Sequence, residues 1–332
     1  MQAMQLTRPG PIASGPLEAR QVGDPAPGPD ELLVDVAACA VCRTDLQLVE
    51  GDLAPRALPV IPGHQAVGRV VAVGKEVTNW SAGDRAGIGW LAETCGTCRY
   101  CTSGRENLCA SAKFTGWDRN GGYSEQVLVR ADFALRMPEA PSEVELAPLL
   151  CGGIIGFRAL KVSGIRPGGR LGLFGFGASA SLAIQVATHR GCDVFVATRS
   201  EDDQERARRF GAKWAGGYED PIPQPLDAAV TFAPAGDVVI AAVRALDRGG
   251  VVAINAIHLD RVPEFDYDLL WWERQLRSVA NYTREDAREF LQLAAEIPLS
   301  TQVDEYPLIE ANEALVALQR GTTRGTPVLT VG

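Results

Sequence analysis

The sequence predicts an α/β protein in two parts, a doubly wound parallel sheet and a smaller, curved, mainly antiparallel β unit. Two observations lead to this fold class. Between about residues 165 and 280, short buried strands alternate with helical segments, which is typical of a parallel sheet covered by helices. Before about residue 150, many short strands are separated by Gly and Pro turns, which indicates a curved β unit.

The first part of the chain is expected to contain at least three strands. Residues 31–41 form an apolar run that leads into Cys42. Residues 67–77 are β-branched and broken by glycine, which predicts a strand followed by a turn. Residues 84–90 predict another short strand.

The second part of the chain has the alternation that defines the parallel sheet. A glycine turn at residues 168–169 leads into a short buried strand that ends at Phe174. The tail is expected to return to the first domain. The remaining elements are expected at 181–187 (helix), 193–197 (strand), 202–210 (helix), 227–231 (strand), 237–246 (helix), 250–255 (strand), 284–295 (helix) and 310–320 (helix), with a strand at the end.

Composition excludes several classes of partner. The 332 residues include 46% hydrophobic and 22% charged residues, as in ordinary globular proteins. The net charge of −9 disfavours nucleic acids and anionic membranes as partners. The N-terminal residues lack an apolar signal-peptide core, and no run is expected to reach the roughly 18 apolar residues of a membrane span. A cytoplasmic location is therefore expected.

Four cysteines form the most specific local pattern. Because a chain of this size does not need disulfides and no export signal is visible, the clustered cysteines indicate metal ligands. Four thiols within fifteen residues can enclose one tetrahedral ion without an open position, as in structural zinc sites. An iron–sulfur cluster and four unrelated free thiols are the alternatives. These cysteines are Cys95, Cys98, Cys101 and Cys109.

A second metal site is predicted from residues far apart in the sequence. Cys42 and His64 carry the thiolate and imidazole that zinc prefers, and Cys151 is the best candidate for a third ligand. Such a set leaves one tetrahedral position open, as a catalytic zinc requires. Each residue taken alone is more often a small buried side chain.

A dinucleotide-binding fingerprint lies between the strand that ends at Phe174 and the helix that follows. The glycines of this Gly-x-Gly-x-x-Ala motif allow a tight turn and close approach of a pyrophosphate, and the small alanine lets helix and strand pack closely. The helix N-terminus then faces the phosphates. The three residues are Gly175, Gly177 and Ala180.

The end of the next strand predicts NADP(H) rather than NAD(H). NAD enzymes usually place an acidic residue here to bind the ribose 2′-hydroxyl. This chain has Thr198, Arg199 and Ser200, whose hydroxyls and guanidinium suit a 2′-phosphate. Residues 201–203 are acidic and argue against a phosphate, but we interpret them as first-turn acids of the following helix. The alternative is that Arg199 is a solvated surface residue.

Taken together, these motifs resemble the zinc-dependent medium-chain alcohol dehydrogenases, and the bacterial enzymes in particular. The resemblance covers nearly the whole chain. Its carriers are Val41-Cys42-Arg43-Thr44-Asp45, Ile61-Pro62-Gly63-His64, the four-cysteine lobe, Gly121-Gly122-Tyr123-Ser124-Glu125, Leu150-Cys151, the Gly175 fingerprint and a Trp-containing segment near Gly89-Trp90-Leu91.

The resemblance implies a domain plan. A GroES-like, distorted-barrel catalytic domain would comprise residues 1–155 and 285–332, with a structural zinc lobe at 91–112. A Rossmann dinucleotide-binding domain would comprise residues 156–284. The active site would lie between them, and the enzyme would form a homodimer or homotetramer.

The resemblance also implies roles for single residues. Cys42, His64 and Cys151 would bind the catalytic zinc, and the four clustered cysteines the structural zinc. Thr44 would accept the proton of the substrate hydroxyl, and Asp45 would orient His64. A hydride would then pass between an alcohol or aldehyde and the nicotinamide, so that the chain would act as an alcohol dehydrogenase or aldehyde reductase.

Three departures from the family pattern, and several residues without a firm role, remain. The family usually has Glu where this chain has Gln65, and several relatives have a proton-relay His where it has Gln47. The family also commonly has Gly where this chain has Ala40. Trp90 and Trp117 are expected either to line an apolar substrate pocket or to pack in the core. No catalytic role is assigned to the two other histidines, His189 and His258.

Two competing functions share parts of this pattern. A zinc-independent quinone or enone reductase would have the same fold, but it would lack the Cys42–His64–Cys151 set. A non-enzymatic, metal-stabilised cofactor sensor would not need an open zinc position.

Overall fold

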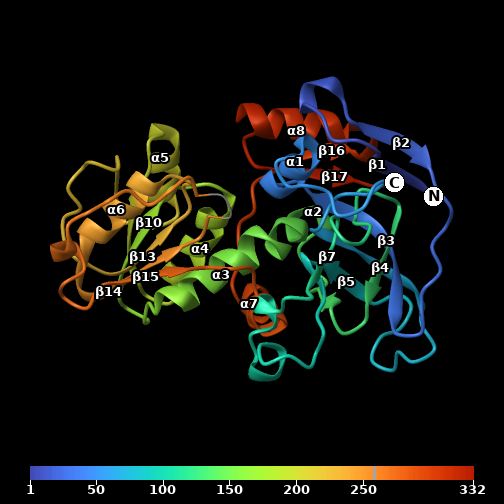
Figure 1. Cartoon of the computed structure of the whole chain (residues 1–332), viewed down its shortest axis with the longest axis horizontal. Helices are drawn as coiled ribbons and strands as arrows, with labels where there is room; N and C mark the ends of the chain where they lie inside the picture. Colours follow the sequence, from blue (N-terminus) through green and yellow to red (C-terminus); the bar gives the residue numbers. More distant parts are fainter. Residues whose placement is uncertain (257–258) are drawn as a thin grey trace. The chain divides into compact units, whose positions relative to one another are not determined.

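A computed structural model describes residues 1–256 and 259–332, so His258 lies outside the described residues. The chain divides into two compact units (Figure 1). Unit 1 comprises Met1–Cys151 and Thr283–Gly332, and unit 2 comprises Gly152–Tyr282. The domain plan drawn from the resemblance places the divisions at residues 155 and 284.

Unit 2 contains the predicted doubly wound sheet. Its six strands are parallel and lie in the order β12-β11-β10-β13-β14-β15, which is the strand order of the Rossmann fold. The prediction for this part of the fold is confirmed. The strands are β10 (Arg170–Phe174), β11 (Asp193–Ala197), β12 (Trp214–Gly216), β13 (Leu226–Thr231), β14 (Leu246–Ile254) and β15 (Gln275–Ser278).

Within the described residues of unit 2, four α-helices accompany this sheet. Three were predicted within a few residues of their observed bounds, but α3 was not. A run with glycines at 152, 153 and 156 looks like a turn, yet a Cβ at Gly156 would lie 2.9 Å from the Ser179 carbonyl oxygen, so this glycine lets α3 pack closely on α4. The helices are α3 (Gly152–Ser163), α4 (Ala178–His189), α5 (Glu201–Arg209) and α6 (Gly236–Ala245), with a 3₁₀ turn η5 (Tyr267–Leu269).

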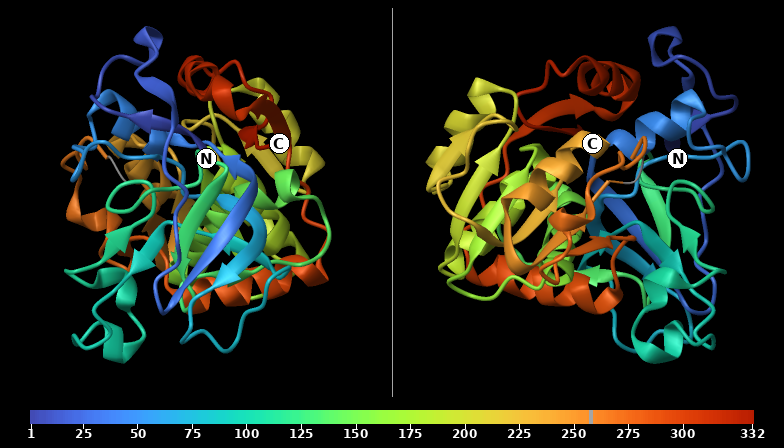
Figure 2. Two further views of the ribbon diagram at one scale, coloured as in Figure 1. Left: turned by 90° about the vertical axis from the view of Figure 1, so that its right-hand side faces the viewer. Right: turned by 60° about the vertical axis from the view of Figure 1, so that its left-hand side comes forward.

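Unit 1 is built on a curved, mainly antiparallel sheet (Figure 2). Its strand order is β16-β17-β3-β4-β5-β9, with β8 also paired to β3. Strand β17 pairs with β3, so the C-terminal tail returns to the first part of the chain, as predicted. The strands are β3 (Glu31–Ala40), β4 (Ala66–Val73), β5 (Arg85–Ile88), β8 (Gln126–Arg130), β9 (Leu135–Arg136), β16 (Val303–Pro307) and β17 (Thr326–Thr330).

Smaller elements complete unit 1. The strand pairs are β1 (Gln2–Leu6) with β2 (Leu17–Gln21) and β6 (Leu91–Glu93) with β7 (Lys113–Phe114). The α-helices are α1 (Arg43–Glu50), α2 (Glu143–Leu146), α7 (Arg284–Glu296) and α8 (Ala311–Arg320). The 3₁₀ turns are η1 (Ile12–Ser14), η2 (Cys101–Ser103), η3 (Glu106–Leu108), η4 (Ala147–Leu150) and η6 (Leu308–Glu310).

One helical stretch is more apolar than the sequence analysis expected. Residues Glu143–Ser163 have a mean hydropathy of 1.4 over an 18-residue window, which meets the length and composition of a membrane span. Of that window, 67% is buried inside the protein. A core helix of a globular protein passes the same test, and the burial of α3 fits that interpretation.

Candidate metal centres and cofactor site

The three predicted ligands of the first metal site converge in unit 1. Cys42 precedes α1, His64 lies in the loop before β4, and Cys151 follows η4. Their ligand atoms all lie within 4.8 Å of one another, and Cys42 Sγ is 3.5 Å from His64 Nε2. Zinc bonds of about 2.0–2.3 Å place tetrahedral ligands roughly 3.4–3.8 Å apart, so a donor set of this kind fits a zinc ion.

Asp45 organises this site from the first turn of α1. Its side chain is 3% exposed, and Oδ2 accepts a hydrogen bond from the Cys42 backbone N–H at 2.9 Å. Oδ1 lies 3.1 Å from His64 Nδ1 and accepts a bond from the Gly63 N–H at 3.3 Å. With Nδ1 directed at Asp45, Nε2 is left facing Cys42, which is the orientation a metal ligand needs.

The protonation of the ligands shows how strongly this site is coupled. The hydrogen bond with Cys151, together with burial, raises the pKa of Cys42 well above its usual value. Burial opposes a charge on His64, but the negative charges of Asp45 and Cys42 outweigh it and raise the pKa of His64 to about 10. Both shifts favour the protonated forms of Cys42 and His64, and a bound cation would displace those protons.

The four-cysteine lobe forms a second, closed set of donors. The Sγ–Sγ distances are 3.9 Å for Cys95–Cys101, 3.5 Å for Cys98–Cys101 and 3.6 Å for Cys109–Cys95. All four sulfurs lie within 4.8 Å of one another, close to the edges of a zinc–thiolate tetrahedron. Backbone N–H groups of Thr97 and Cys98 lower the pKa of Cys95 to about 6, which favours the thiolate that binds metal.

Gln65, the first departure from the family pattern, is buried beside the triad. It is 2% exposed, and its Nε2 donates to the Ala40 carbonyl at 3.3 Å. A glutamate carboxylate has no N–H to donate and would face that carbonyl oxygen instead. The amide is therefore matched to its surroundings. The second departure, Gln47, is half-buried in α1.

An aromatic stack extends from the metal ligand His64. The ring of Trp90 meets His64 edge-on at 4.8 Å and stacks on Phe114 and Trp117 at 5.1 and 6.0 Å. The Arg56 guanidinium covers Trp117 at 3.7 Å. The two tryptophans were candidates from the sequence, but Phe114 and Arg56 were not, because nothing in their spacing shows that the loops carrying them meet.

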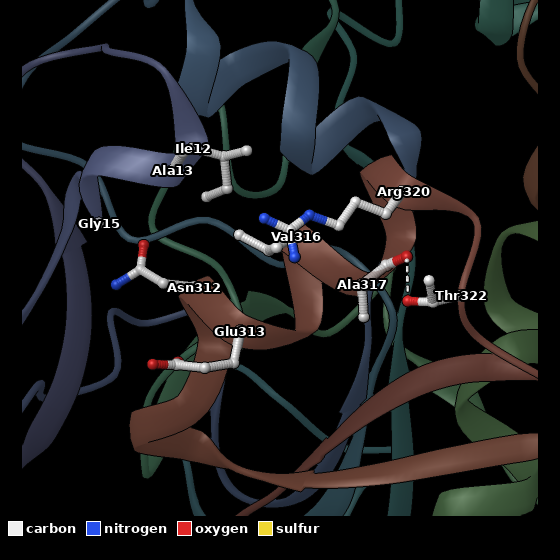
Figure 3. A pocket seen from close by; sticks show the side chains of 9 residues that line it. All are labelled: Ile12, Ala13, Gly15, Asn312, Glu313, Val316, Ala317, Arg320 and Thr322. Carbon is white, nitrogen blue, oxygen red and sulfur yellow. Dashed lines mark hydrogen bonds between the residues drawn. The ribbon is translucent and has the colours of Figure 1, made fainter.

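A cavity of about 330 Å³ lies elsewhere in unit 1, between η1 and α8 (Figure 3). Asn312 at its edge exchanges two hydrogen bonds with the backbone of Leu17, and the side chains of Glu313 and Arg320 also line it. None of the lining residues belongs to either donor set or to the aromatic stack. The cavity therefore adds nothing to the metal sites.

The fingerprint in unit 2 has the backbone that its glycines predict. Gly175 has φ +93°, and a Cβ there would lie 2.9 Å from the Ala233 nitrogen. Gly177 immediately precedes α4, and a Cβ there would meet nothing within 4 Å, so the backbone is open to an approaching phosphate. Ala180 is fully buried in the first turn of α4.

The end of β11 contains the three predicted cofactor residues and one that was missed. Thr198 is buried, whereas Arg199 and Ser200 are exposed, and the Ser200 hydroxyl accepts the Asp203 N–H as the N-cap of α5. Burial raises the pKa of Tyr218, the positive charge of Arg199 lowers it, the negative charge of Asp203 raises it, and a hydrogen bond with Thr198 lowers it. Tyr218 therefore interacts with Thr198 and lies in the field of Arg199 and Asp203. It follows β12, and only the parallel pairing of β11 with β12 brings it there.

The acidic residues after Ser200 lie where the sequence analysis placed them. Glu201, Asp202 and Asp203 form the first turn of α5. Asp203 is paired with Arg206 at 2.9 Å, and Arg206 also donates to the Phe176 carbonyl within the fingerprint loop. The Arg206 charge therefore offsets the charge of Asp203.

Comparison with known proteins identifies the family. Residues 28–139 match the model of the alcohol dehydrogenase GroES-like domain, and residues 180–296 match that of the zinc-binding dehydrogenases. A Mycobacterium tuberculosis protein named as an alcohol dehydrogenase, AdhA, is 49% identical over 100% of this chain and 97% of its own. The chain belongs to the zinc-dependent medium-chain alcohol dehydrogenases. Members of this family are oxidoreductases that act on alcohols.

Other relatives match nearly the whole chain at lower sequence identity. An alcohol dehydrogenase of Geobacillus stearothermophilus is 35% identical over 94% of this chain and 95% of its own. Among solved structures, one described as a zinc-binding dehydrogenase of Sinorhizobium meliloti bound to NADP has a TM-score of 0.88. It is 26% identical and covers 99% of both chains. The predicted combination of a GroES-like and a Rossmann domain is thereby confirmed.

Proposed function

We propose that this protein is a zinc-dependent alcohol dehydrogenase and aldehyde reductase for small to medium substrates, with its catalytic zinc at Cys42, His64 and Cys151. The observation that carries the proposal is the convergence of these donors, with ligand atoms within 4.8 Å although up to 109 positions separate them in the chain. Three protein ligands leave a tetrahedral position open for substrate. When bound, zinc supplies Lewis acidity, and the nicotinamide accepts or gives the hydride.

The side chains around the triad have distinct tasks in this proposal. Thr44, which is 8% exposed and lies in the first turn of α1 two residues after Cys42, accepts the proton of the alcohol hydroxyl. Asp45 holds His64 in the tautomer that directs Nε2 at the metal. Trp90 and Trp117 form an apolar wall beside His64 that excludes water and binds the carbon chain of the substrate.

The four-cysteine lobe, by the same proposal, binds a second zinc with a structural role. It has four thiolate donors and therefore no open position for a substrate. Two zinc ions per chain are expected. A single zinc would support only the lobe, and none would favour the quinone or enone reductase.

The cofactor proposed is NADP(H). Thr198, Arg199, Ser200 and Tyr218 offer three hydroxyls and one guanidinium at the end of β11, and a 2′-phosphate needs such donors. The Ser200 hydroxyl accepts a backbone N–H but keeps its own proton free to donate. The fingerprint residues Gly175, Gly177 and Ala180 bind the pyrophosphate in this proposal.

Arg199→Ala tests the choice of cofactor. We expect KM for NADPH to rise about tenfold or more, with KM for NADH little changed, because one charge-assisted contact to the phosphate is lost. Arg209→Ala is the matched control, since it removes the same charge from an exposed position of the same unit. If NADH is preferred by the unmodified protein, the cofactor proposal is wrong while the zinc proposal stands.

A substrate panel tests the activity itself. The unmodified protein is assayed with primary alcohols, secondary alcohols and aldehydes, with each nicotinamide cofactor and in both directions, after its zinc content has been measured. Turnover that disappears on zinc removal and returns with zinc supports the proposal. Two zinc ions without turnover of any alcohol or aldehyde would favour the cofactor sensor.

We also propose a cytoplasmic homodimer or homotetramer. Strand β15 is at an edge of the unit 2 sheet, and edge strands present unpaired backbone groups. Close to it in sequence, Tyr267, Trp271 and Trp272 are 67%, 58% and 46% exposed, a concentration of aromatic surface suited to a subunit interface. Sedimentation of the protein, compared with a Trp271→Ser variant, tests this assignment.

A further inference from the structure

Tyr123 is a buried tyrosine whose hydroxyl the proposed reaction does not use. It belongs to the Gly121–Glu125 motif, and its side chain is 0% exposed. The hydroxyl makes no hydrogen bond of normal geometry within the described part of the chain. A buried, unpaired hydroxyl costs about 1–3 kcal/mol, so its retention at this position calls for an explanation.

The backbone around Tyr123 holds the loop that carries His64. The N–H groups of Gly121, Gly122 and Tyr123 donate to the carbonyls of Ile61, Gly63 and Pro62 at 2.7, 2.8 and 3.0 Å. The ring of Tyr123 lies directly against Gly63, where a Cβ would be 2.4 Å from its Cδ1. The loop and the tyrosine are thus packed as one block beside the triad.

The acceptor that borders this block is Asp45, because the N–H of Gly63, on which the Tyr123 ring packs, donates to Asp45 Oδ1 at 3.3 Å. A tyrosine hydroxyl has an ordinary pKa of about 10, so at neutral pH it is protonated and able to donate. Asp45 already accepts from the Cys42 and Gly63 N–H groups and from His64 Nδ1. A carboxylate has about four acceptor positions, so one remains available.

We infer that Tyr123 is a positioning residue of the catalytic metal site, whose hydroxyl donates to the free acceptor position of Asp45 when His64 binds zinc. The contact completes the acceptor set of the carboxylate that fixes the His64 ring. Groups that orient a metal ligand in this way typically change metal affinity 10–100-fold when they are removed. The inference rests on the proposed function, because it assumes that the triad binds zinc.

Tyr123→Phe tests the inference because it keeps the ring against Gly63 and removes only the hydroxyl. Zinc release to a chromogenic chelator is followed in the unmodified protein, in Tyr123→Phe, in Asp45→Asn and in the double variant. Release from a Cys151→Ser variant identifies the lobe zinc, which serves as an internal reference. Tyr306→Phe is the matched control, since it makes the same chemical change elsewhere in unit 1.

The expected result is a roughly tenfold faster release of one zinc from Tyr123→Phe, with the lobe zinc unchanged. Because the hydroxyl acts through Asp45, adding Tyr123→Phe to Asp45→Asn should produce little further change. The d–d spectrum of cobalt in the triad should also shift in Tyr123→Phe. A purely structural hydroxyl predicts unchanged zinc release and unchanged or higher thermal stability, since an unpaired polar group is removed.

Either unchanged zinc release in Tyr123→Phe or fully multiplicative effects in the double variant would overturn the inference. The outcome is separable from the proposed function. If the unmodified protein holds only the lobe zinc, the catalytic site itself is wrong. If it holds two zinc ions and Tyr123→Phe behaves like the unmodified protein, only the role of Tyr123 is wrong.

Discussion

The two donor sets of unit 1 both bring potential metal ligands together, but one gathers them from neighbouring residues and the other from distant parts of the chain. The lobe gathers four thiols from residues 95–109 in a region of short turns, and Cys95 is exposed. The triad gathers residues 42, 64 and 151 from three separate elements, and its histidine is 1% exposed. A local, closed set depends on its metal for order, whereas a non-local set is positioned by the folded sheet and by Asp45.

From this difference we expect the triad to control catalytic activity and the four-cysteine lobe to control stability. In the proposed function the triad keeps an open position, and because its ligands are flanked by β3, β4 and α1, loss of its metal should change the fold little. The lobe has no open position and few buried apolar residues of its own.

Cys151→Ser should have the largest effect, and on activity alone. Loss of one triad ligand should lower kcat/KM about a thousandfold, because several kcal/mol of Lewis-acid stabilisation are lost. Zinc content should fall by one ion per chain, with only a small change in thermal midpoint. Cys192→Ser, a buried thiol of unit 2 outside both sets, is the control. Retained activity in Cys151→Ser would contradict the assignment of catalytic activity to the triad.

Cys109→Ser should act mainly on stability. Cys109 is the most buried of the four lobe thiols, and its loss opens the tetrahedron. We expect one zinc to be lost and the thermal midpoint to fall by on the order of 10 °C, since ligand binding in closed sites is folding free energy. Specific activity of the protein that remains folded should stay within a few-fold. Calorimetry together with metal analysis measures both quantities.

The same contrast explains what the sequence could predict. The lobe follows from spacing alone, because its ligands are neighbours in the chain. Cys151 has no fixed spacing from Cys42, so the residues alone offered it as the best candidate for a third ligand, and the resemblance to a family gave it the role of a zinc ligand. Helix α3 was missed because Gly156 predicts an interruption of a helix in the sequence, whereas in the fold it allows α3 to pack closely on α4. Tyr218 was missed for a related reason, since strand pairing alone brings it to the end of β11.

Glu106→Ala tests the role of the lobe in stability, because it removes a contact between the lobe and α7 while leaving all four thiols in place. Glu106 is 7% exposed, and its Oε1 accepts from the backbone N–H of Arg284 at 3.0 Å and from its Nε at 3.3 Å. This contact joins the lobe to the start of α7. Its loss should lower the free energy of unfolding by about 2 kcal/mol, as expected for a buried, charged hydrogen bond.

The control for Glu106→Ala is Glu285→Ala, which lies in the first turn of α7 next to Arg284, the partner of Glu106. Glu285 is 67% exposed and lies 3.7 Å from Arg288, a surface pair expected to contribute less than about 0.5 kcal/mol. Urea unfolding curves of both variants, with zinc content measured in parallel, give the comparison. Equal losses in the two variants would show that the lobe is not anchored through Glu106.

Asp227→Asn has the smallest expected effect and separates acid-induced metal loss from acid-induced unfolding. Asp227 lies at the start of β13, where the hydrogen bond from the Arg170 side chain lowers its pKa. A lowered folded-state pKa means that this contact stabilises the protein above about pH 4 and is lost as the pH falls through the folded-state value. Because the pair is partly exposed, its contribution should be under about 1 kcal/mol.

Hydrogen exchange at residues 226–231 measures this contribution without interference from either metal site, because those residues lie in unit 2. Protection in the unmodified protein should exceed that in Asp227→Asn at pH 7, and the two should converge on acidification as the carboxyl group is protonated. Zinc should leave the thiolates of unit 1 on acidification in both proteins alike, since its ligands must be deprotonated. A difference in β13 protection that instead followed zinc release would mean that metal binding also stabilises unit 2, and the division into an activity site and a stability site would have to be redrawn.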